Sequence, residues 1–397
     1  MQKETVYGKI KGNENEAFFR RKKARKRRSI FMKFVCNGMV LSEAALTVSK
    51  ACASKTITPI LECIKIHAEN DGITLTAYDG EISIEKKIKA DVFEEGEICV
   101  NGKMFSDFVG KISAFEVVIA TVDSGIIIKY ADSESFMQSL SSDDFPRFLN
   151  NTAENKEYFE TKESELKGLI AKVVFCCASD DSRPILKGAL LEAKDGKLNA
   201  TALDGYRMAC SSIETLSTSG NMKIVCPART LVEISRMLDG DEELKIYADK
   251  NLLYVSVKDT VITSRLYLGE FVRKENIYPI DFTTKVEVKR SEIIESVERA
   301  SVLIRGEKDN LITLDIKNEK IVINAVSDIG KIEETVAGDL DGKELKISMN
   351  SKFLLDAIKA LDEEKILLSF NTPVSPFTVE NVEDKRCQYL ILPVSSR

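Results

Sequence analysis

The feature that most constrains this chain is a pattern of strands and turns that occurs three times. Residues 58–82, "TPILECIKIHAENDGITLTAYDGEI", and residues 183–207, "RPILKGALLEAKDGKLNATALDGYR", share Pro-Ile-Leu, two alternating strands, a polar turn and Asp-Gly. A fainter copy, "NLITLDIKNEKIVINAVSDIGKI", occupies residues 310–332. Self-similarity of this kind indicates a repeated domain. Alternation of apolar and polar residues predicts hairpins in each copy, with turns at Asn70-Asp71-Gly72, Asp195-Gly196 and Asn318-Glu319.

Helical segments repeat in the same order. Residues 100–113, 226–239 and 349–362 align without a gap, and each opens with Asn or Pro before apolar residues spaced three and four apart. An earlier amphipathic helix begins each copy, in "VLSEAALTVSKACAS", "SELKGLIAKVVFCCAS" and "SEIIESVERASVLI". Strands with one apolar face, covered by a helix pair, predict an α+β fold with antiparallel sheets. The domains are predicted at 32–150, 151–280 and 281–397, after an N-terminal extension at 1–31.

The N-terminal extension differs from the rest of the chain in its net charge. Residues 1–31 hold 11 Lys and Arg against 3 Asp and Glu, including "RRKKARKRR" at 20–28, although the whole chain of 397 residues carries a net charge of −6. A like-charged block of this density is typical of a disordered, solvated tail. A nucleic-acid-binding arm, or a folded protein that begins at Met32, are the alternatives.

Basic residues recur at matching positions of the repeated helices, although residues 32–397 are acidic overall. Lys103, Arg229 and Lys352 share one column of the later helices. Residues seven further on lie on the same helix face. These positions add Arg236 and Lys359, with Lys111 displaced by one, and the opening helices add Lys50, Lys167, Lys172, Arg290 and Arg299. For one helix this would be an ordinary solvated face. Its threefold repetition predicts a basic surface for the phosphates of duplex DNA, bound without sequence preference.

Few residues suited to catalysis or to metal binding are available. The nine cysteines include no C-x-x-C pair and have mostly apolar neighbours, which is typical of buried thiols in a reducing compartment. His67, the single histidine, lies in an alternating segment and is expected at a strand surface. A metal-dependent phosphodiesterase built from Asp79, Asp204 and Asp328 is an alternative, but one aspartate per repeat would be dispersed. We therefore expect no metal and no cofactor.

No stretch is long and apolar enough for a membrane span, and the N-terminus has no apolar signal core. These features predict a cytoplasmic protein without a membrane partner.

The region from Met32 onward resembles the family of bacterial DNA polymerase III β subunits, the replicative sliding clamps. The resemblance depends on "MKF" at 32–34, "PIL" at 59–61, "DFPRF" at 144–148, "LLEAKDGKLNATALDGYRMA" at 190–209, "RMLDGDEEL" at 236–244 and "YLILPV" at 389–394. It implies three copies of one α+β domain in each chain. Two chains would join head to tail as a homodimeric ring of six domains, with sheets outside and helices lining the hole.

The resemblance also implies a function and partners. The chain would be a non-catalytic processivity factor that encircles double-stranded DNA. It would tether the polymerase III catalytic subunit, the clamp loader and repair polymerases through short linear motifs. A protein-interaction scaffold of the same fold, without DNA inside, is the alternative.

A peptide-binding cleft between the second and third domains is part of the same implication. Carried onto this chain, its wall comprises Leu186, Leu203, Gly205, Tyr206, Arg207, Met208, Val272, Ile277, Leu390, Leu392 and Val394. An apolar slot with an adaptable methionine suits Leu and Phe side chains, and Arg207 is expected to orient the bound segment. We expect Met208→Asp to weaken peptide binding without unfolding the chain.

Two loop residues, Lys55 and Arg183, match the positions where the family's central loops approach DNA. Asp180 and Asp181 depart from that pattern, because carboxylates repel phosphate. They are expected to cap a turn instead.

Overall fold

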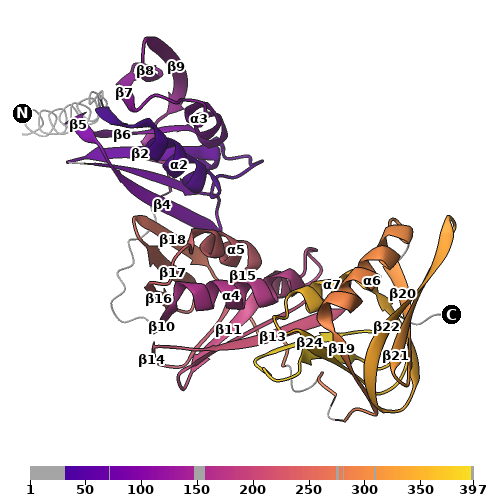
Figure 1. Cartoon of the computed structure of the whole chain (residues 1–397). Coiled ribbons are helices and arrows are strands. Elements are labelled where there is room, and N and C mark those ends of the chain that lie inside the picture. Colours follow the sequence, from indigo (N-terminus) through magenta and orange to yellow (C-terminus); the bar gives the residue numbers. More distant parts are fainter. Residues whose placement is uncertain are drawn as a thin grey trace, which may run out of the picture. The chain divides into compact units, whose positions relative to one another are not determined.

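The computed structural model describes residues 32–70, 72–146, 157–273, 277–279, 281–307 and 310–394. The basic extension 1–31 and the predicted domain boundaries near residues 150 and 280 lie outside these ranges. The chain divides into two compact units, Met1–Asn150 with Lys258–Val261, and Asn151–Val257 with Ile262–Arg397 (Figure 1). Each unit is described by itself.

The first unit holds one copy of the repeat. Its strands hydrogen-bond in the order β4-β3-β2-β6-β9-β8-β7-β1-β5, all antiparallel. The elements are β1 (Lys33–Asn37), α2 (Gly38–Ser49), η1 (Pro59–Glu62), β2 (Cys63–Glu69), β3 (Gly72–Tyr78), β4 (Ile82–Lys89), β5 (Asp91–Glu94), β6 (Gly96–Asn101), α3 (Gly102–Val109), β7 (Glu116–Val122), β8 (Gly125–Tyr130), β9 (Ser133–Leu140) and η2 (Ser142–Asp144).

The second copy follows the same order of elements. It comprises β10 (Glu157–Lys162), α4 (Glu163–Val173), η3 (Val174–Cys176), η4 (Pro184–Lys187), β11 (Gly188–Lys194), β12 (Lys197–Leu203), β13 (Arg207–Glu214), β14 (Ser217–Ser219), β15 (Met222–Pro227), α5 (Ala228–Met237), β16 (Glu243–Ala248), β17 (Leu252–Val257) and β18 (Thr260–Arg265). Both copies place the Pro-Ile-Leu segment in a short 3₁₀ turn before a hairpin.

The third copy completes the second unit. It comprises β19 (Thr284–Lys289), α6 (Arg290–Leu303), β20 (Leu311–Lys317), β21 (Lys320–Ser327), β22 (Gly330–Gly342), β23 (Leu345–Asn350), α7 (Ser351–Lys359), β24 (Lys365–Phe370), β25 (Phe377–Asn381) and β26 (Cys387–Ile391). The α+β class, the antiparallel sheets and the threefold repetition predicted from the sequence are therefore confirmed.

Local sequence explains where the helices and hairpins begin. The side chains of Asn37, Asn101 and Asn350 accept hydrogen bonds from backbone N–H groups of the first turns of α2, α3 and α7. Such N-caps satisfy donors that a helix leaves unpaired. The turns also follow the sequence, since Asp195 and Glu319 adopt positive φ between strands that pair across two residues.

In each copy the helix pair covers one face of the sheet. Helix α2 packs on β4 and β3, α4 on β13 and β12, and α6 on β22 and β21, while each also contacts its partner helix. The buried face of α6 consists of Ile293, Ser296, Val297 and Ala300, at the three-to-four spacing of one helix stripe. The opposite helix faces remain exposed, which is where the predicted basic positions belong.

One sheet runs through the second and third copies. Its order is β15-β11-β12-β13-β26-β25-β24-β19-β22-β21-β20-β23. The junction is the antiparallel pair β13 and β26, in register from Arg207 opposite Ile391 to Ser211 opposite Cys387. The C-terminal strand of the third copy is thereby an ordinary neighbour of the second copy's sheet. This explains why contacts group the two copies into one compact unit.

Tyr389 reinforces this junction from within. Its ring is 1% exposed, and its hydroxyl donates a hydrogen bond of 2.9 Å to the carbonyl oxygen of Lys172 on α4. Burial raises the pKa of the phenol, so the donating form persists at neutral pH.

We expect Tyr389→Phe to lower the free energy of unfolding of the second unit by about 1–2 kcal/mol, because it removes the hydroxyl that donates to the partly buried carbonyl of Lys172. Urea unfolding followed by circular dichroism would measure the change. Tyr158→Phe is the control, since no hydrogen bond of its hydroxyl is found within the described residues. Equal stability of the wild type and Tyr389→Phe would contradict the role assigned to this hydroxyl.

Candidate functional site

The turn between β12 and β13 is shaped by Asp204. Its Oδ1 atom accepts hydrogen bonds from the backbone N–H groups of Tyr206 and Arg207, at 2.9 and 3.0 Å. Gly205 has φ of 94°, a conformation that side chains disfavour. The turn leaves Tyr206 projecting with 64% of its surface exposed. Asp79 makes the same contacts to Glu81 and Ile82 in the first copy, so this carboxylate shapes the turn in both.

Arg207 joins this turn to the third copy. Its Nε donates to Asp204 at 3.0 Å, its Nη1 to Asp356 on α7 at 2.6 Å, and its Nη2 to the carbonyl of Phe175 at 2.8 Å. Burial opposes the charge, yet the hydrogen bonds that Arg207 donates to Asp356 and Asp204 raise its pKa above the ordinary value. The guanidinium carbon also lies 4.5 Å from the centre of the Phe353 ring.

This geometry gives Arg207 a structural role beside the expected one of orienting a bound segment. Three of its five N–H groups donate within the chain, and the residue is 9% exposed. Arg207 is therefore a positioning residue. It holds the turn carrying Tyr206 against α7, where the rings of Tyr206 and Phe353 stack at 6.2 Å between centroids.

An apolar cluster lies beneath the turn. Its buried members come from both copies of the repeat and from the segment after β18, and they are Leu186, Leu190, Leu203, Met208, Val225, Phe271 and Leu390. Partly buried Val272, Ile277 and Leu392 pack against it. The backbone N–H groups of Leu392 and Val394 donate to Tyr206 and Ser348 at 2.9 and 2.8 Å. Seven of the eleven residues predicted for the cleft thus pack in this one cluster: Leu186, Leu203, Met208, Val272, Ile277, Leu390 and Leu392.

Several residues predicted to line the cleft are more deeply buried than expected. Met208 and Leu390 are each 2% exposed, and Leu186 is 3% exposed. The part of the cluster that remains accessible is therefore supplied by the half-buried Val272, Ile277 and Leu392 and by the exposed Tyr206. A carboxylate at position 208 would be buried without a partner, so we now expect Met208→Asp to destabilise the fold as well as to weaken peptide binding.

Sequence reasoning missed Phe353, Asp356 and Phe175. The buried stripe of α7 comprises Ser351, Leu354, Ala357 and Ile358. Phe353 is apolar yet lies outside that stripe, which is the one signal that could have identified it.

Most of the predicted basic positions have partners nearby. Lys103 pairs with Asp107 at 3.0 Å, Arg236 with Glu233 at 2.5 Å, Lys172 with Asp362 at 2.6 Å and Lys359 with Glu298 at 2.6 Å. Arg299 donates twice to Glu334, and this lowers the pKa of the carboxyl. Lys50 and Arg229 are exposed and also interact within the chain. The basic surface is therefore partly neutralised.

Two residues predicted to face DNA instead donate hydrogen bonds to the end of a neighbouring helix. Lys167 on α4 donates to the carbonyl of Leu238 at the end of α5, at 2.7 Å. Arg290 on α6 donates to the carbonyls of Ile358 and Lys359 at the end of α7, at 3.0 and 3.1 Å. In both copies a cation of the first helix thus satisfies the unpaired carbonyls at the end of the second.

The remaining cations are exposed. Lys55, Lys111, Arg183 and Lys352 make no side-chain ion pair within the described ranges. Asp180, close to Arg183 in sequence, accepts a hydrogen bond from the backbone of Ser182, so its predicted turn-capping role is confirmed. Asp181 instead pairs with Lys187 at 2.7 Å, and no capping hydrogen bond of its side chain is found among the described residues.

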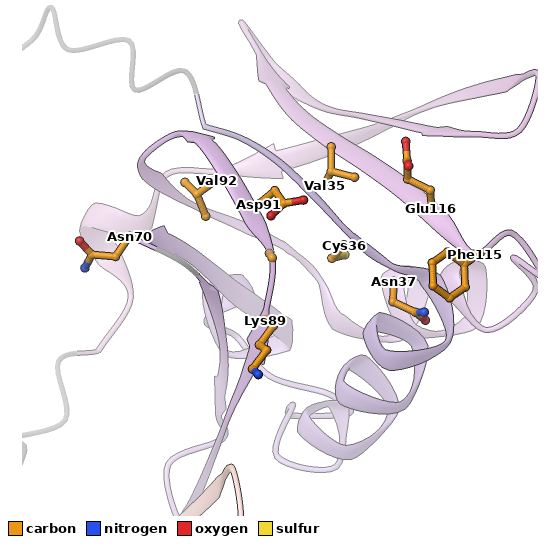
Figure 2. Close-up of a pocket in the computed structure, with 10 residues that line it drawn as sticks. Val35, Cys36, Asn37, Asn70, Lys89, Asp91, Val92, Phe115 and Glu116 are labelled. Carbon is orange, nitrogen blue, oxygen red and sulfur yellow. The ribbon is translucent and has the colours of Figure 1, made fainter.

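A separate concavity of about 700 Å³ lies in the first unit, beside β1 and β5 (Figure 2). Asn37 lines it but uses its side-chain oxygen to cap α2. Burial raises the pKa of the Cys36 thiol to about 12, so it stays protonated and is a poor nucleophile. This pocket therefore lacks an activated nucleophile, and no group of His, Cys, Asp or Glu suited to a metal occurs in the described part of the chain.

His67 lies on β2 with its side chain 40% exposed, so its predicted place on a strand surface is confirmed. Within the ranges described, no helix is both long and apolar enough to cross a membrane.

Comparisons with known proteins agree with this architecture. The N-terminal, central and C-terminal domains of the DNA polymerase III beta subunit match residues 32–149, 160–272 and 275–395. The beta sliding clamp of Halalkalibacterium halodurans is 32% identical over 379 residues, which cover 91% of this chain and 99% of that protein.

Solved structures give the same result. The DNA polymerase sliding clamp of Bacillus subtilis superposes with a TM-score of 0.88 at 30% identity, covering 92% of this chain and all of that one. A putative DNA polymerase III beta subunit of Eubacterium rectale gives a TM-score of 0.86 at 32% identity, covering 91% and 99%. With three consecutive domains matched, the chain belongs to the DNA polymerase III β subunit family, the sliding clamps.

Proposed function

We propose that two copies of this chain form a ring that encircles duplex DNA and tethers DNA polymerase to its template. The observation that carries this proposal is the match of three consecutive β subunit domains along the chain. Proteins of this family are non-catalytic processivity factors, and the chain is one of them. Because such a factor acts on the chromosome, we assign it to the bacterial cytoplasm.

Ring closure would follow from pairing the first domain of one chain with the third domain of the other. Two copies joined head to tail form two equal heterologous junctions, which close without leaving a free end. The proposed ring has six domains, with sheets outside and helix pairs facing the DNA. Each chain would contribute three of these domains, with the predicted limits 32–150, 151–280 and 281–397.

Ion pairs that partly neutralise the basic residues of the helices are compatible with a ring that slides along DNA. Exposed ion pairs such as Lys103 with Asp107 contribute only about 0–1 kcal/mol, so a passing phosphate can replace the carboxylate at little cost. A surface of uniform, unpaired cations would bind phosphate more tightly and slow translation along DNA. Retention then depends on closure of the ring rather than on affinity.

Topological retention makes a direct prediction. A ring loaded on nicked circular DNA should remain bound at about 0.5–1 M salt, where phosphate contacts are largely screened. Linearising the circle with a restriction enzyme should release it within minutes. Gel filtration of labelled protein with DNA would measure both.

The loading experiment needs a preparation of known size. A dimer has twice the 44.3 kDa mass of one chain, which light scattering would verify. Equal loss from the intact and the cut circle would refute encirclement and leave the scaffold without DNA as the function.

The exposed cations should contribute the electrostatic part of DNA contact. We expect the triple variant Lys111→Glu, Arg183→Glu and Lys352→Glu to weaken duplex binding at low salt. The slope of log affinity against log salt should fall by roughly 0.9 for each phosphate that is no longer neutralised. Fluorescence anisotropy with a labelled duplex would measure this slope.

The matched control reverses three exposed lysines on strands, Lys285→Glu, Lys320→Glu and Lys346→Glu. It changes net charge equally and should leave the slope nearer to that of the wild type. If both variants lower the slope equally, Lys111, Arg183 and Lys352 are not DNA-facing residues.

The slot beneath Tyr206 is proposed as the tether for partner proteins. The polymerase III catalytic subunit, the clamp loader and repair polymerases would each insert a short segment with Leu or Phe side chains. The half-buried surfaces of Val272, Ile277 and Leu392 would contact these side chains, and Tyr206 would cover them. Leu203, Gly205, Met208 and Leu390 would shape the floor, with Arg207 holding the turn in place.

Leu392→Ser should test this assignment without burying a charge. Removal of the apolar side chain should weaken binding of a labelled peptide containing Leu and Phe by about 5- to 30-fold, or roughly 1–2 kcal/mol. Val374→Ser is the control, because Val374 is apolar and 70% exposed but lies in a different loop. Unchanged peptide affinity in a folded Leu392→Ser protein would remove the slot from the proposal.

A further inference from the structure

A groove borders the apolar cluster along the open side of β15. It encloses about 430 Å³. Leu190, Val225 and Phe271 line it, and the same three residues belong to the apolar cluster beneath the slot. The groove therefore adjoins the proposed peptide slot, so that a segment bound at the slot can continue into the groove.

The rim of this groove is basic. Lys223 on β15, Lys250 between β16 and β17, and Arg273 after Phe271 all line it, against one acidic residue, Glu270. Lys223 pairs with Glu192 at 2.8 Å, but its side chain is 64% exposed, and such pairs are weak. Lys250 and Arg273 form no ion pair with any residue that the structure describes. The groove thus presents an excess of positive charge over an apolar floor.

The backbone of β15 is also open on this side. Strand β15 is the last strand of its sheet and pairs along its other side with β11. On the open side it meets a single bridge, in which the N–H of Tyr267 donates to the carbonyl of Val225 at 3.0 Å. Because backbone groups alternate along a strand, the N–H and C=O of Lys223 point to the same open side as those of Val225.

We propose that this groove binds an acidic, extended segment that flanks the apolar motif of a partner peptide. The acidic side chains contact Lys223, Lys250 and Arg273, and the peptide backbone can pair with the open edge at Lys223. This inference depends on the proposed peptide slot. It further specifies that the partner segment beside the apolar motif is acidic. Electrostatic complementarity of this kind favours acidic partners over neutral ones.

Single-stranded nucleic acid is the competing occupant, because phosphates also bind lysine and arginine. Sequence-tolerant binding of single strands uses exposed aromatic rings on which bases stack. Here Phe271 is 8% exposed and Tyr267 is half-buried against the apolar cluster. The floor therefore favours apolar side chains and a paired backbone, as in a peptide.

The test uses two labelled peptides with the same Leu-Phe core, one extended by three glutamates and the other by three glutamines, each made with the extension before or after the core. In one orientation, wild-type protein should bind the glutamate peptide about 5- to 10-fold more tightly at low salt, as expected for two or three exposed ion pairs. The preference should disappear at about 0.5 M salt.

The double variant Lys250→Glu and Arg273→Glu should lose or reverse this preference, while its affinity for the glutamine peptide stays unchanged. Lys285→Glu with Lys346→Glu alters net charge equally, far from β15 in the sheet order, and should keep most of the preference. If wild-type protein binds both peptides equally in both orientations, the groove proposal is overturned and the slot remains. If neither peptide binds, the slot itself fails.

A third probe distinguishes single-stranded nucleic acid from an acidic peptide as the occupant of the groove. Binding of a labelled oligothymidine strand should be the same for the double variant and its control. Loss of oligothymidine binding in the double variant alone, with the glutamate preference retained, would overturn the peptide assignment in favour of nucleic acid.

Discussion

The pairing of β13 with β26 is the interaction on which the candidate site depends. It places Met208 opposite Leu390 and Arg207 opposite Ile391, so that two copies of the repeat share one sheet. The apolar cluster then draws residues from both copies without needing a flexible domain interface. Arg207 adds a second link through Asp356 on α7. The apolar cluster is consequently held in place by backbone pairing and by an ion pair as well as by side-chain packing.

Much of this architecture could be predicted from local patterns. The three copies, the helix caps at Asn37, Asn101 and Asn350, and the turn at Asp204 each depend on a few neighbouring residues. The apolar members of the slot were found through the family resemblance. In these cases the structure is determined by interactions between residues close in sequence, or the residues belong to a motif known from the family.

The partners of the charged residues could not be predicted in the same way. Arg207 and Asp356 are separated by 149 positions, and Arg299 and Glu334 by 35. Lys167 and Arg290 were expected to face DNA, but each caps a neighbouring helix. A basic side chain offers the same signal in sequence whether it meets solvent, a carbonyl or a carboxylate. Only the packing of the helices distinguishes these cases.

The order in which the sheet is completed has a consequence for synthesis of the protein. Tyr389 of β26 reaches a carbonyl that lies 217 positions earlier in the chain. Until the ribosome has delivered that strand, β13 has an unpaired edge next to apolar side chains. Exposed edges of this kind promote aggregation. Nascent chains are therefore most dependent on chaperones during the interval in which the second copy is complete and the last strand is still being made.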